Sequence, residues 1–284
     1  MARRRRRKGS SERRGLSESY RRAGDDMALE GDLDAAKAHY ERAAQLDDSN
    51  ADAHVSLGDS YLASEMPSEA YRAYKKALSV HPRHAQAHAA LAEFLARHGF
   101  LKQALRAQER AVNCDPHRPY LQYRLAELYV RAGQFDRAEE LLGRAISMDS
   151  REALYHYKLA ELQVRRGQWD AAVSAYRDAT RCSPLDDFYH VRLAAVLIRL
   201  QRRQEALVVL ERAVRIDPAN RAHRYLLGEL MVLMGRLEAG NEHLRRAGGL
   251  DEYDRAYIGR VKLRSGQLRE DEQLVTISPI DIPA

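Results

Sequence analysis

Residues 57–82 read LGDSYLASEMPSEAYRAYKKALSVHP, and residues 159–184 read LAELQVRRGQWDAAVSAYRDATRCSP. The two stretches align without a gap at an offset of three 34-residue units. Carrying this register outward divides most of the chain into seven consecutive units, which span 17–50, 51–84, 85–118, 119–152, 153–186, 187–220 and 221–254. A fixed period of this length is the sequence signature of a repeat architecture.

Three positions of the unit hold small residues throughout. Position 8 is Gly or Ala in every unit: Gly24, Gly58, Ala92, Ala126, Ala160, Ala194 and Gly228. Position 20 is Ala in six units and Gly240 in the last, and position 27 is Ala in all seven. Larger residues recur at positions 4, 7, 11 and 24. Small residues at fixed places let two helices approach closely while larger ones fill the remaining space, so each unit predicts an antiparallel pair of helices.

The boundaries of these helices follow from glycine and proline. We expect the first helix of each pair to cover about unit positions 1–14 and the second about 18–30. Glycine ends the first helix at position 15 in five units, at Gly31, Gly99, Gly133, Gly167 and Gly235. Proline follows the second helix at Pro82, Pro116, Pro184 and Pro218.

This pattern resembles the tetratricopeptide repeat, in which Trp, Leu-Gly, Tyr, Ala, Phe and Pro recur at set places. The second unit meets it with His54, Leu57, Gly58, Tyr61, Ala70, Tyr74 and Pro82. The resemblance covers about four-fifths of the chain and implies an all-α, right-handed superhelical solenoid of stacked helix pairs. It further implies a concave groove that binds a segment of another protein.

The two ends of the chain depart from the repeat. Residues 1–16 lack apolar periodicity, and we expect a disordered arginine-rich tail there. After residue 254, YIGRVKLRSGQ predicts a degenerate eighth first helix that caps the array and extends to about residue 270. Residues 271–284 include LVTISPIDIPA, which is rich in β-branched residues and proline, so an extended tail is expected.

The net charge of +6 is located almost wholly in the first sixteen residues. The remainder is close to neutral, so the sequence pI of about 9.3 says little about the folded surface. No apolar run is long enough to span a membrane, and no apolar segment follows the arginines as a secretory signal requires. Two cysteines in 284 residues fit a reducing compartment. The cytoplasm is the expected location, and the arginine and alanine bias suggests a bacterial source.

The expected groove can be read from a helical wheel of about 100° per residue. Positions 2, 5, 9 and 13 of each first helix lie away from the face that packs on the second helix. In the fourth to seventh units these positions and their neighbours carry an aromatic strip flanked by charges. We predict that partner binding involves Tyr120, Tyr123, Glu127, Arg131, Leu154, Tyr157, Glu161, Arg165, Phe188, Val191, Arg199, Tyr225 and Glu229.

A different interpretation of the same residues is open. Glu127 with Arg131, and Glu161 with Arg165, are i,i+4 pairs in the favourable order, each worth about 0.2–0.5 kcal/mol on an ordinary solvated helix. The aromatic residues could pack between neighbouring repeats. Exposed aromatic clusters nevertheless tend to bind other molecules, and we therefore favour a binding surface.

Other functional sites are disfavoured. Cys114 and Cys182 both occupy unit position 30, an apolar column, two units apart, which predicts separate structural thiols. His84 and His88 are four residues apart, but His88 falls on a packing position, so metal ligation is not expected. The nucleophile, phosphate-binding and metal motifs GxSxG, GxGxxG, GxxxxGK, HExxH and CxxC do not occur. We predict neither an enzyme nor a cofactor.

One branch of the resembled family is also disfavoured. Tetratricopeptide domains that clamp a C-terminal carboxylate carry Lys at position 5 and Asn at position 9 of the first unit. Those positions are Arg21 and Asp25 in this chain, and no unit has Asn at position 9. A chaperone carboxylate clamp is therefore not expected.

The arginine run leaves three partners open. Arg3, Arg4, Arg5, Arg6, Arg7 and Lys8 could neutralise phosphates of RNA or DNA, touch an anionic membrane surface or bind an acidic protein. The sequence predicts a non-enzymatic scaffold or adaptor that captures a partner segment in the groove, as a subunit of a larger assembly. The alternative is a nucleic-acid-associated adaptor that binds through this tail.

Overall fold

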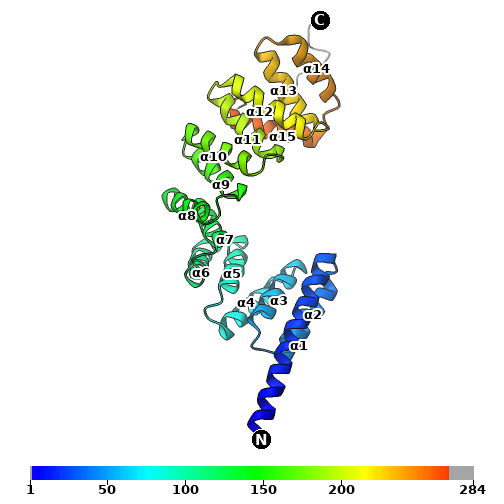
Figure 1. The fold of residues 1–284 in the computed structure, drawn as a ribbon, viewed down its shortest axis with the longest axis vertical. Coiled ribbons are helices and arrows are strands. Elements are labelled where there is room, and N and C mark those ends of the chain that lie inside the picture. Colours follow the sequence, from blue (N-terminus) through cyan, green and yellow to red (C-terminus); the bar gives the residue numbers. More distant parts are fainter. Residues whose placement is uncertain (1, 269–284) are drawn as a thin grey trace. The chain divides into compact units, whose positions relative to one another are not determined.

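The computed structural model describes residues 2–268, with side chains from residue 11 onward. Its contacts divide the chain into two compact parts, residues 1–148 and 149–284, which are called unit 1 and unit 2 and treated separately below. The 34-residue units of the sequence are called repeats from here on. The described part of each unit consists of helices, and Figure 1 shows that they follow one another as antiparallel pairs. The all-α repeat architecture predicted from the sequence is confirmed.

Unit 1 contains four helix pairs. In each pair, two or three residues connect the first helix to the second. The bounds are α1 Ala2–Glu30, α2 Leu33–Leu46, α3 Ala51–Ala63, α4 Pro67–Val80, α5 Ala85–Arg97, α6 Leu101–Cys114, α7 Pro119–Arg131 and α8 Phe135–Met148.

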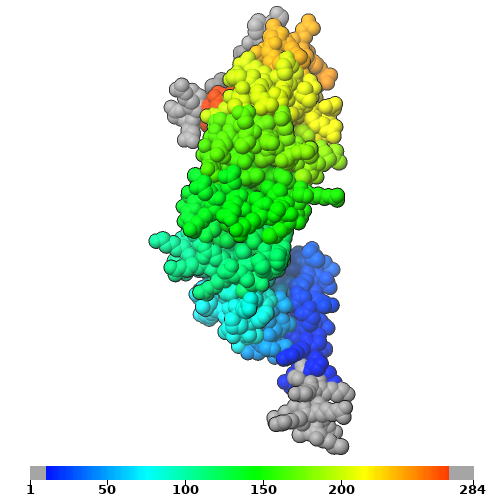
Figure 2. Space-filling view, turned by 60° about the vertical axis from the view of Figure 1, so that its left-hand side comes forward, coloured from blue at the N-terminus to red at the C-terminus, as the bar shows by residue number. Residues whose placement is uncertain are grey.

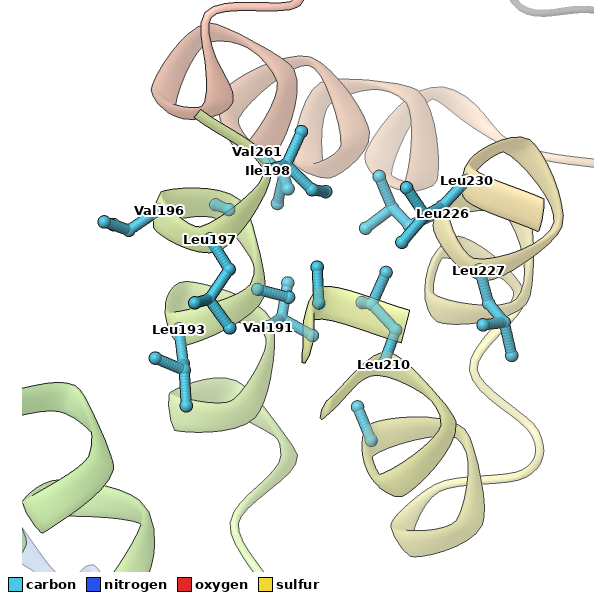
Figure 3. Close-up of a cluster of buried hydrophobic side chains, with 14 of the residues drawn as sticks. Val191, Leu193, Val196, Leu197, Ile198, Leu210, Leu226, Leu227, Leu230 and Val261 are labelled. Carbon is cyan, nitrogen blue, oxygen red and sulfur yellow. The ribbon is translucent and has the colours of Figure 1, made fainter. Parts of the chain in front are cut away.

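Unit 2 contains three helix pairs and one additional helix. Its cores join into one buried cluster, which Figure 3 shows between α11, α12 and α13. The bounds are α9 Ala153–Arg165, α10 Trp169–Cys182, α11 Asp187–Arg199, α12 Arg203–Ile216, α13 Arg221–Leu233, α14 Leu237–Ala247 and α15 Glu252–Ser265.

The small residues are located where the two helices of a pair approach each other. Ala70, Ala77 and Ala92 are completely buried, as are their equivalents in the other pairs. Between α13 and α14, a Cβ atom added to Gly228 would lie 2.8 Å from the backbone carbonyl oxygen of Gly240. The predicted role of positions 8, 20 and 27 is thus confirmed.

The turn inside each pair has one left-handed residue. Glycine supplies it at the five positions predicted from the sequence, with φ between 72° and 87°. The second and sixth repeats place Glu65 and Gln201 there instead, each with φ of 59°. The turn geometry is therefore kept even where an L-residue must adopt a conformation that costs about 1–2 kcal/mol.

The N-terminal segment differs from its prediction. The structure carries α1 back to Ala2, so residues 2–16 are the first part of a helix rather than a disordered tail. Seven of these fifteen residues are arginine, a good helix former, and a helix already nucleated at residues 17–30 can extend through Gly15 and Gly9 without the cost of nucleation. The predicted C-terminal tail, residues 271–284, lies outside the described residues.

Helix α15 also differs from its prediction. Within unit 1 and within unit 2, each first helix that follows a pair of the same unit packs against the second helix of that pair. An eighth first helix would therefore pack on α14, but α15 packs mainly on α11 and also on α13. The reason is local: α14 has 11 residues where α12 has 14, and it ends at Ala247, before Gly248 and Gly249, the latter with φ of 77°.

The turn before α15 is fixed by charge. Arg221 donates hydrogen bonds to the carbonyl oxygen of Gly249 at 2.7 Å and to the carboxylate of Asp251 at 2.8 Å. Asp251 and Asp254 then form a capping box at the start of α15. The chain is thereby directed away from the surface of α14.

We expect Gly228→Ala to lower the urea midpoint of unfolding, followed by circular dichroism, by an amount that corresponds to about 1–3 kcal/mol. The added methyl group meets the backbone of Gly240, which cannot rotate away as a side chain could. Gly143→Ala on α8 is the matched control, because nothing lies within 4 Å of its added Cβ. The control should be neutral or stabilising by up to about 1 kcal/mol, and an equal loss in both variants would contradict the explanation.

Candidate partner-binding face

The inner face is defined here as the side of each first helix that carries positions 2, 5, 9 and 13 of the 34-residue repeat. In unit 1 it is formed by α1, α3, α5 and α7, and in unit 2 by α9, α11 and α13. Every predicted site residue belongs to it, except those of the N-terminal run. None of the described helices combines the length and hydropathy that a membrane span requires.

Three of the predicted anchor residues are buried. Tyr123 is 6% exposed, Val191 1% and Tyr225 2%, so the prediction that they contact solvent is wrong. A wheel of one isolated helix places position 5 at the edge of the free strip. In the array, the neighbouring pair packs against that edge, as the burial of Val55 at the same position also shows.

In unit 1 the remaining predicted residues lie on α7. Tyr120 is 45% exposed, and its ring lies 5.9 Å from that of Tyr123, between ring centres. Glu127 pairs with Arg124 at 3.2 Å, and Arg131 donates to the carbonyl oxygen of Ala96 at 2.9 Å. Glu127 and Arg131 are thus already engaged by polar groups of α5 and α7.

In unit 2 the predicted aromatic residues contact one another. The ring of Tyr157 lies 5.2 Å from that of Phe188 and 5.6 Å from that of Tyr189, in edge-on or tilted geometry. Leu154 beside them is half-buried and Arg165 is exposed. Arg199 lies over the ring of Trp169 at 4.2 Å. The aromatic strip of unit 2 is therefore partly a packing cluster.

Helix α15 covers much of the inner face of unit 2. Its buried residues are Ile258, Val261, Lys262 and Ser265, which form one stripe along the helix. Val261 points into the apolar cluster beside Ile198 of α11 (Figure 3). Figure 2 shows α15 in orange-red at the side of unit 2, bordered by the yellow-green surface of earlier helices.

Two cationic residues of α15 bind acidic residues of the inner face. Lys262 pairs with Glu229, and its ammonium lies 5.5 Å from the ring centre of Tyr225. This contact explains why Glu229, predicted to be accessible, is buried. The second cation, Arg264, pairs with Glu161 of α9, 103 residues earlier in the chain.

The Arg264 contact has three hydrogen bonds. Its Nη1 donates to the hydroxyl of Tyr176 at 2.8 Å and also binds Oε1 of Glu161, while Nη2 donates to Oε2 at 3.0 Å. Burial by itself would raise the pKa of Glu161, but the guanidinium and the Tyr176 hydroxyl hold it below its ordinary value. Glu161 is therefore an anion that the protein has solvated with its own donors.

The tyrosine in this contact was not among the predicted site residues. In three repeats, the tyrosine at repeat position 24, on the second helix, donates a hydrogen bond from its hydroxyl to the acidic residue at repeat position 9, on the first helix. These pairs are Tyr40 with Asp25 at 3.0 Å, Tyr74 with Asp59 at 2.6 Å, and Tyr176 with Glu161. The available signal was that every repeat with Tyr at position 24 has an acid at position 9.

A hollow of about 370 Å³ lies beside the pair Asp59–Tyr74 in unit 1. Leu62, Ala63 and Ala90 give its lining apolar surface, and Glu93 and Arg97 also line it. Desolvation by the surrounding protein raises the pKa of Asp59 above its ordinary value, and the charge of Glu93 adds to this, against the hydrogen bond from Tyr74. These surroundings disfavour the ionised form of Asp59, although its side chain is exposed to solvent, which weakens the effect.

Comparison with known families gives the same repeat. Three profiles described as tetratricopeptide repeat match residues 27–93, 123–187 and 189–220, which together make up more than half of the chain. The chain belongs to the tetratricopeptide repeat family. No curated protein sequence matches it.

Solved tetratricopeptide structures share the fold. PilF of Pseudomonas aeruginosa is 18% identical with a TM-score of 0.64, covering 77% of this chain and 99% of PilF. A thermophilic tetratricopeptide protein of Thermus thermophilus, TTC0263, is 26% identical with a TM-score of 0.53, covering 64% and 98%. YrrB, described as having an unusual peptide-binding site, is 19% identical with a TM-score of 0.52, covering 70% and 98%.

The remaining candidate residues have structural roles in this tetratricopeptide array. Cys114 and Cys182 are free thiols that are half-buried, less than the predicted apolar column implies. His84 caps α5 by accepting from the backbone N–H of Ala87, and His88 bonds to the carbonyl oxygen of Pro82. Among the described residues, no group of three or more His, Cys, Asp or Glu side chains is arranged to hold a metal ion.

The arginine run forms the N-terminal end of α1, but the side chains of Arg3 to Lys8 lie outside the described part of the chain. Nucleic-acid or acidic-partner binding through them stays a prediction.

We expect Arg264→Ala to loosen α15 from unit 2. Hydrogen bonds to charged groups are each worth about 1.5–3 kcal/mol, so opening of α15 should rise roughly 10–150-fold. Hydrogen exchange of residues 252–268, followed by mass spectrometry, measures this, and Arg264→Lys should restore part of the protection. Arg255→Ala, at an exposed position of the same helix, is the control. Unchanged exchange in the Arg264 variant would mean that the apolar stripe alone holds α15.

We expect Asp59→Asn to raise the thermal midpoint at pH 7 by roughly 1–2 °C, since the effect is screened by solvent. Because the folded state raises the pKa of Asp59, its ionisation destabilises the fold as pH rises through that pKa. The difference should therefore shrink as pH falls toward 4. Asn keeps an oxygen for the Tyr74 hydroxyl. Glu140→Gln, at an exposed pair with Arg144, should show no such gain.

Proposed function

We propose that this tetratricopeptide repeat protein is a non-enzymatic scaffold that holds a segment of another protein against its inner face, within a larger assembly. Tetratricopeptide arrays typically act as interaction scaffolds without catalysis, and the fold of this chain is of that kind. The finer statement, capture of a partner on the inner face, is supported by one observation in particular.

That observation is the docking of α15. A helix of 14 residues lies on the inner face of unit 2, with an apolar stripe against α11 and two cations on acids of α9 and α13. These are the contacts by which an amphipathic helix of a partner is held in a groove. The chain's own helix therefore serves as an example of a ligand that such a face can take.

Unit 1 offers the same kind of face without such a cover. No additional helix of the described residues packs on α3, α5 and α7 in the manner of α15. Its inner face presents the ring of Tyr120, the hollow beside Asp59 and the methyl groups of Ala63 and Ala90. We therefore expect the partner to contact unit 1 first.

A photo-crosslinking amino acid at position 63, on the inner face, tests this proposal. With p-benzoylphenylalanine replacing Ala63 in the full chain, irradiation in the native host should give an adduct that mass spectrometry identifies. The partner identified in this way, once purified, should then crosslink to position 63 of the chain in vitro. Ala63 is exposed, so the replacement should not disturb the core.

Position 75 provides the control, because Lys75 is an exposed residue of α4, a second helix of a pair. The proposal requires an adduct from position 63 and none of that identity from position 75. Equal labelling from both positions, or labelling from position 75 alone, would show that partners do not use the inner face.

A further inference from the structure

The three tyrosine–carboxylate pairs differ in whether a cation completes them. Asp25 has Arg21 of its own helix at 2.6 Å. Glu161 has Arg264 of α15, whose guanidinium spans both the carboxylate and the tyrosine hydroxyl. Asp59 has the Tyr74 hydroxyl, but within the described residues no Lys or Arg nitrogen lies within ion-pair distance of it. One pair of the three therefore lacks a cation.

The space beside Asp59 is suited to a side chain. The hollow of about 370 Å³ is large compared with the roughly 30 Å³ that one water molecule occupies in the liquid. Its walls are Leu62, Ala63 and Ala90, so the methylene groups of a long cationic side chain would meet apolar surface. Asp59 and Tyr74, joined by their hydrogen bond, line the same hollow.

The same repeat positions in unit 2 show what the Asp59 hollow lacks. The positions of Ala63 and Ala90 are occupied in unit 2 by Arg165 and Arg192, and the position of Glu93 by Ala195. All three differences make the surroundings of Asp59 more acidic than those of Glu161. Glu161 nevertheless binds a further arginine.

One basic residue opposes this trend. Arg97 is among the residues that line the hollow and lowers the pKa of Asp59, although not enough to reverse the rise. Its guanidinium pairs with Glu93 at 2.6 Å, and its side chain is 66% exposed. Glu93 is further paired with Arg124 at 3.2 Å. Arg97 is therefore engaged with Glu93 and leaves Asp59 open to another cation.

We propose that the Asp59–Tyr74 hollow receives one arginine side chain from a segment of a partner protein. A planar guanidinium can donate to both oxygens of a carboxylate and to a neighbouring hydroxyl at once, as Arg264 does, whereas the ammonium group of lysine acts as a point charge. This proposal rests on the proposed scaffold function and names the chemistry that unit 1 recognises. The occupant is a foreign segment with an arginine anchor.

The test uses the full chain with ¹³C-labelled alanine methyl groups, because Ala63 and Ala90 line the hollow and report on its occupation. The probe is the capped tripeptide acetyl-Ala-Arg-Ala-amide. We expect saturable shifts of these two methyl signals, with a dissociation constant in the millimolar range, as suits one charged contact. Asp59→Asn should weaken binding at least about tenfold while the other alanine signals stay in place.

Three comparisons make the outcome decisive. The citrulline tripeptide, equal in shape but uncharged, should give no saturable shift, and the lysine tripeptide should bind several-fold more weakly. Glu140→Gln, which removes an exposed carboxylate from α8, should leave the affinity unchanged. Equal binding by the citrulline or lysine peptide, or unaltered binding by Asp59→Asn, would overturn the proposal.

A second copy of the chain is the competing occupant. Shifts of Ala63 and Ala90 that depend on protein concentration in the absence of peptide would show that the hollow is filled by self-association, and would overturn the proposal of a foreign arginine. The experiment contains no partner protein. A negative result would therefore leave the crosslinking test of the scaffold function unaffected, and failed crosslinking would leave the affinity for arginine intact.

Discussion

The close approach of the two helices in each pair is the constraint on which the rest of this structure depends. Small residues at three positions of the repeat let one helix contact the backbone of the other, so the pair has little freedom to slide. A Cβ atom on Gly58 would lie 2.5 Å from the ring of Tyr74, which shows that the ring lies directly over the glycine. That placement carries the Tyr74 hydroxyl to Asp59. The contact that stabilises the pair therefore also builds the candidate site.

The repeat and its helix boundaries could be predicted because they depend on local features. Glycine at position 15 and the small columns are visible within each repeat, and the turn keeps its left-handed geometry even at Glu65 and Gln201. The accessibility of position 5 could not be predicted from one helix, since the neighbouring pair decides it. The position of α15 depended on the early end of α14 and on the contacts of Arg221 with the turn, and no other repeat has an arginine at position 1.

The candidate site was predictable in part. Acids at position 9 were identified from the sequence, and the tyrosines at position 24 could have been paired with them by comparing the seven repeats. The cation on Glu161 could not, because Arg264 is 103 residues away and belongs to a helix whose docking no local pattern specifies. Electrostatic pairing across such a separation becomes visible only when the folded chain brings the two groups together.

Under the proposed scaffold function, the docking of α15 would give the two units different thresholds for ligands. The connection from α14 to α15 is residues 248–251, so α15 is tethered beside the face it covers, at an effective concentration in the millimolar range. A foreign segment directed at that face competes with this tether, and its apparent dissociation constant is multiplied by one plus the docking equilibrium constant. Within the described residues, unit 1 has no tethered competitor. A dilute ligand would thus occupy unit 1 alone, and only an abundant or tightly binding one would reach unit 2.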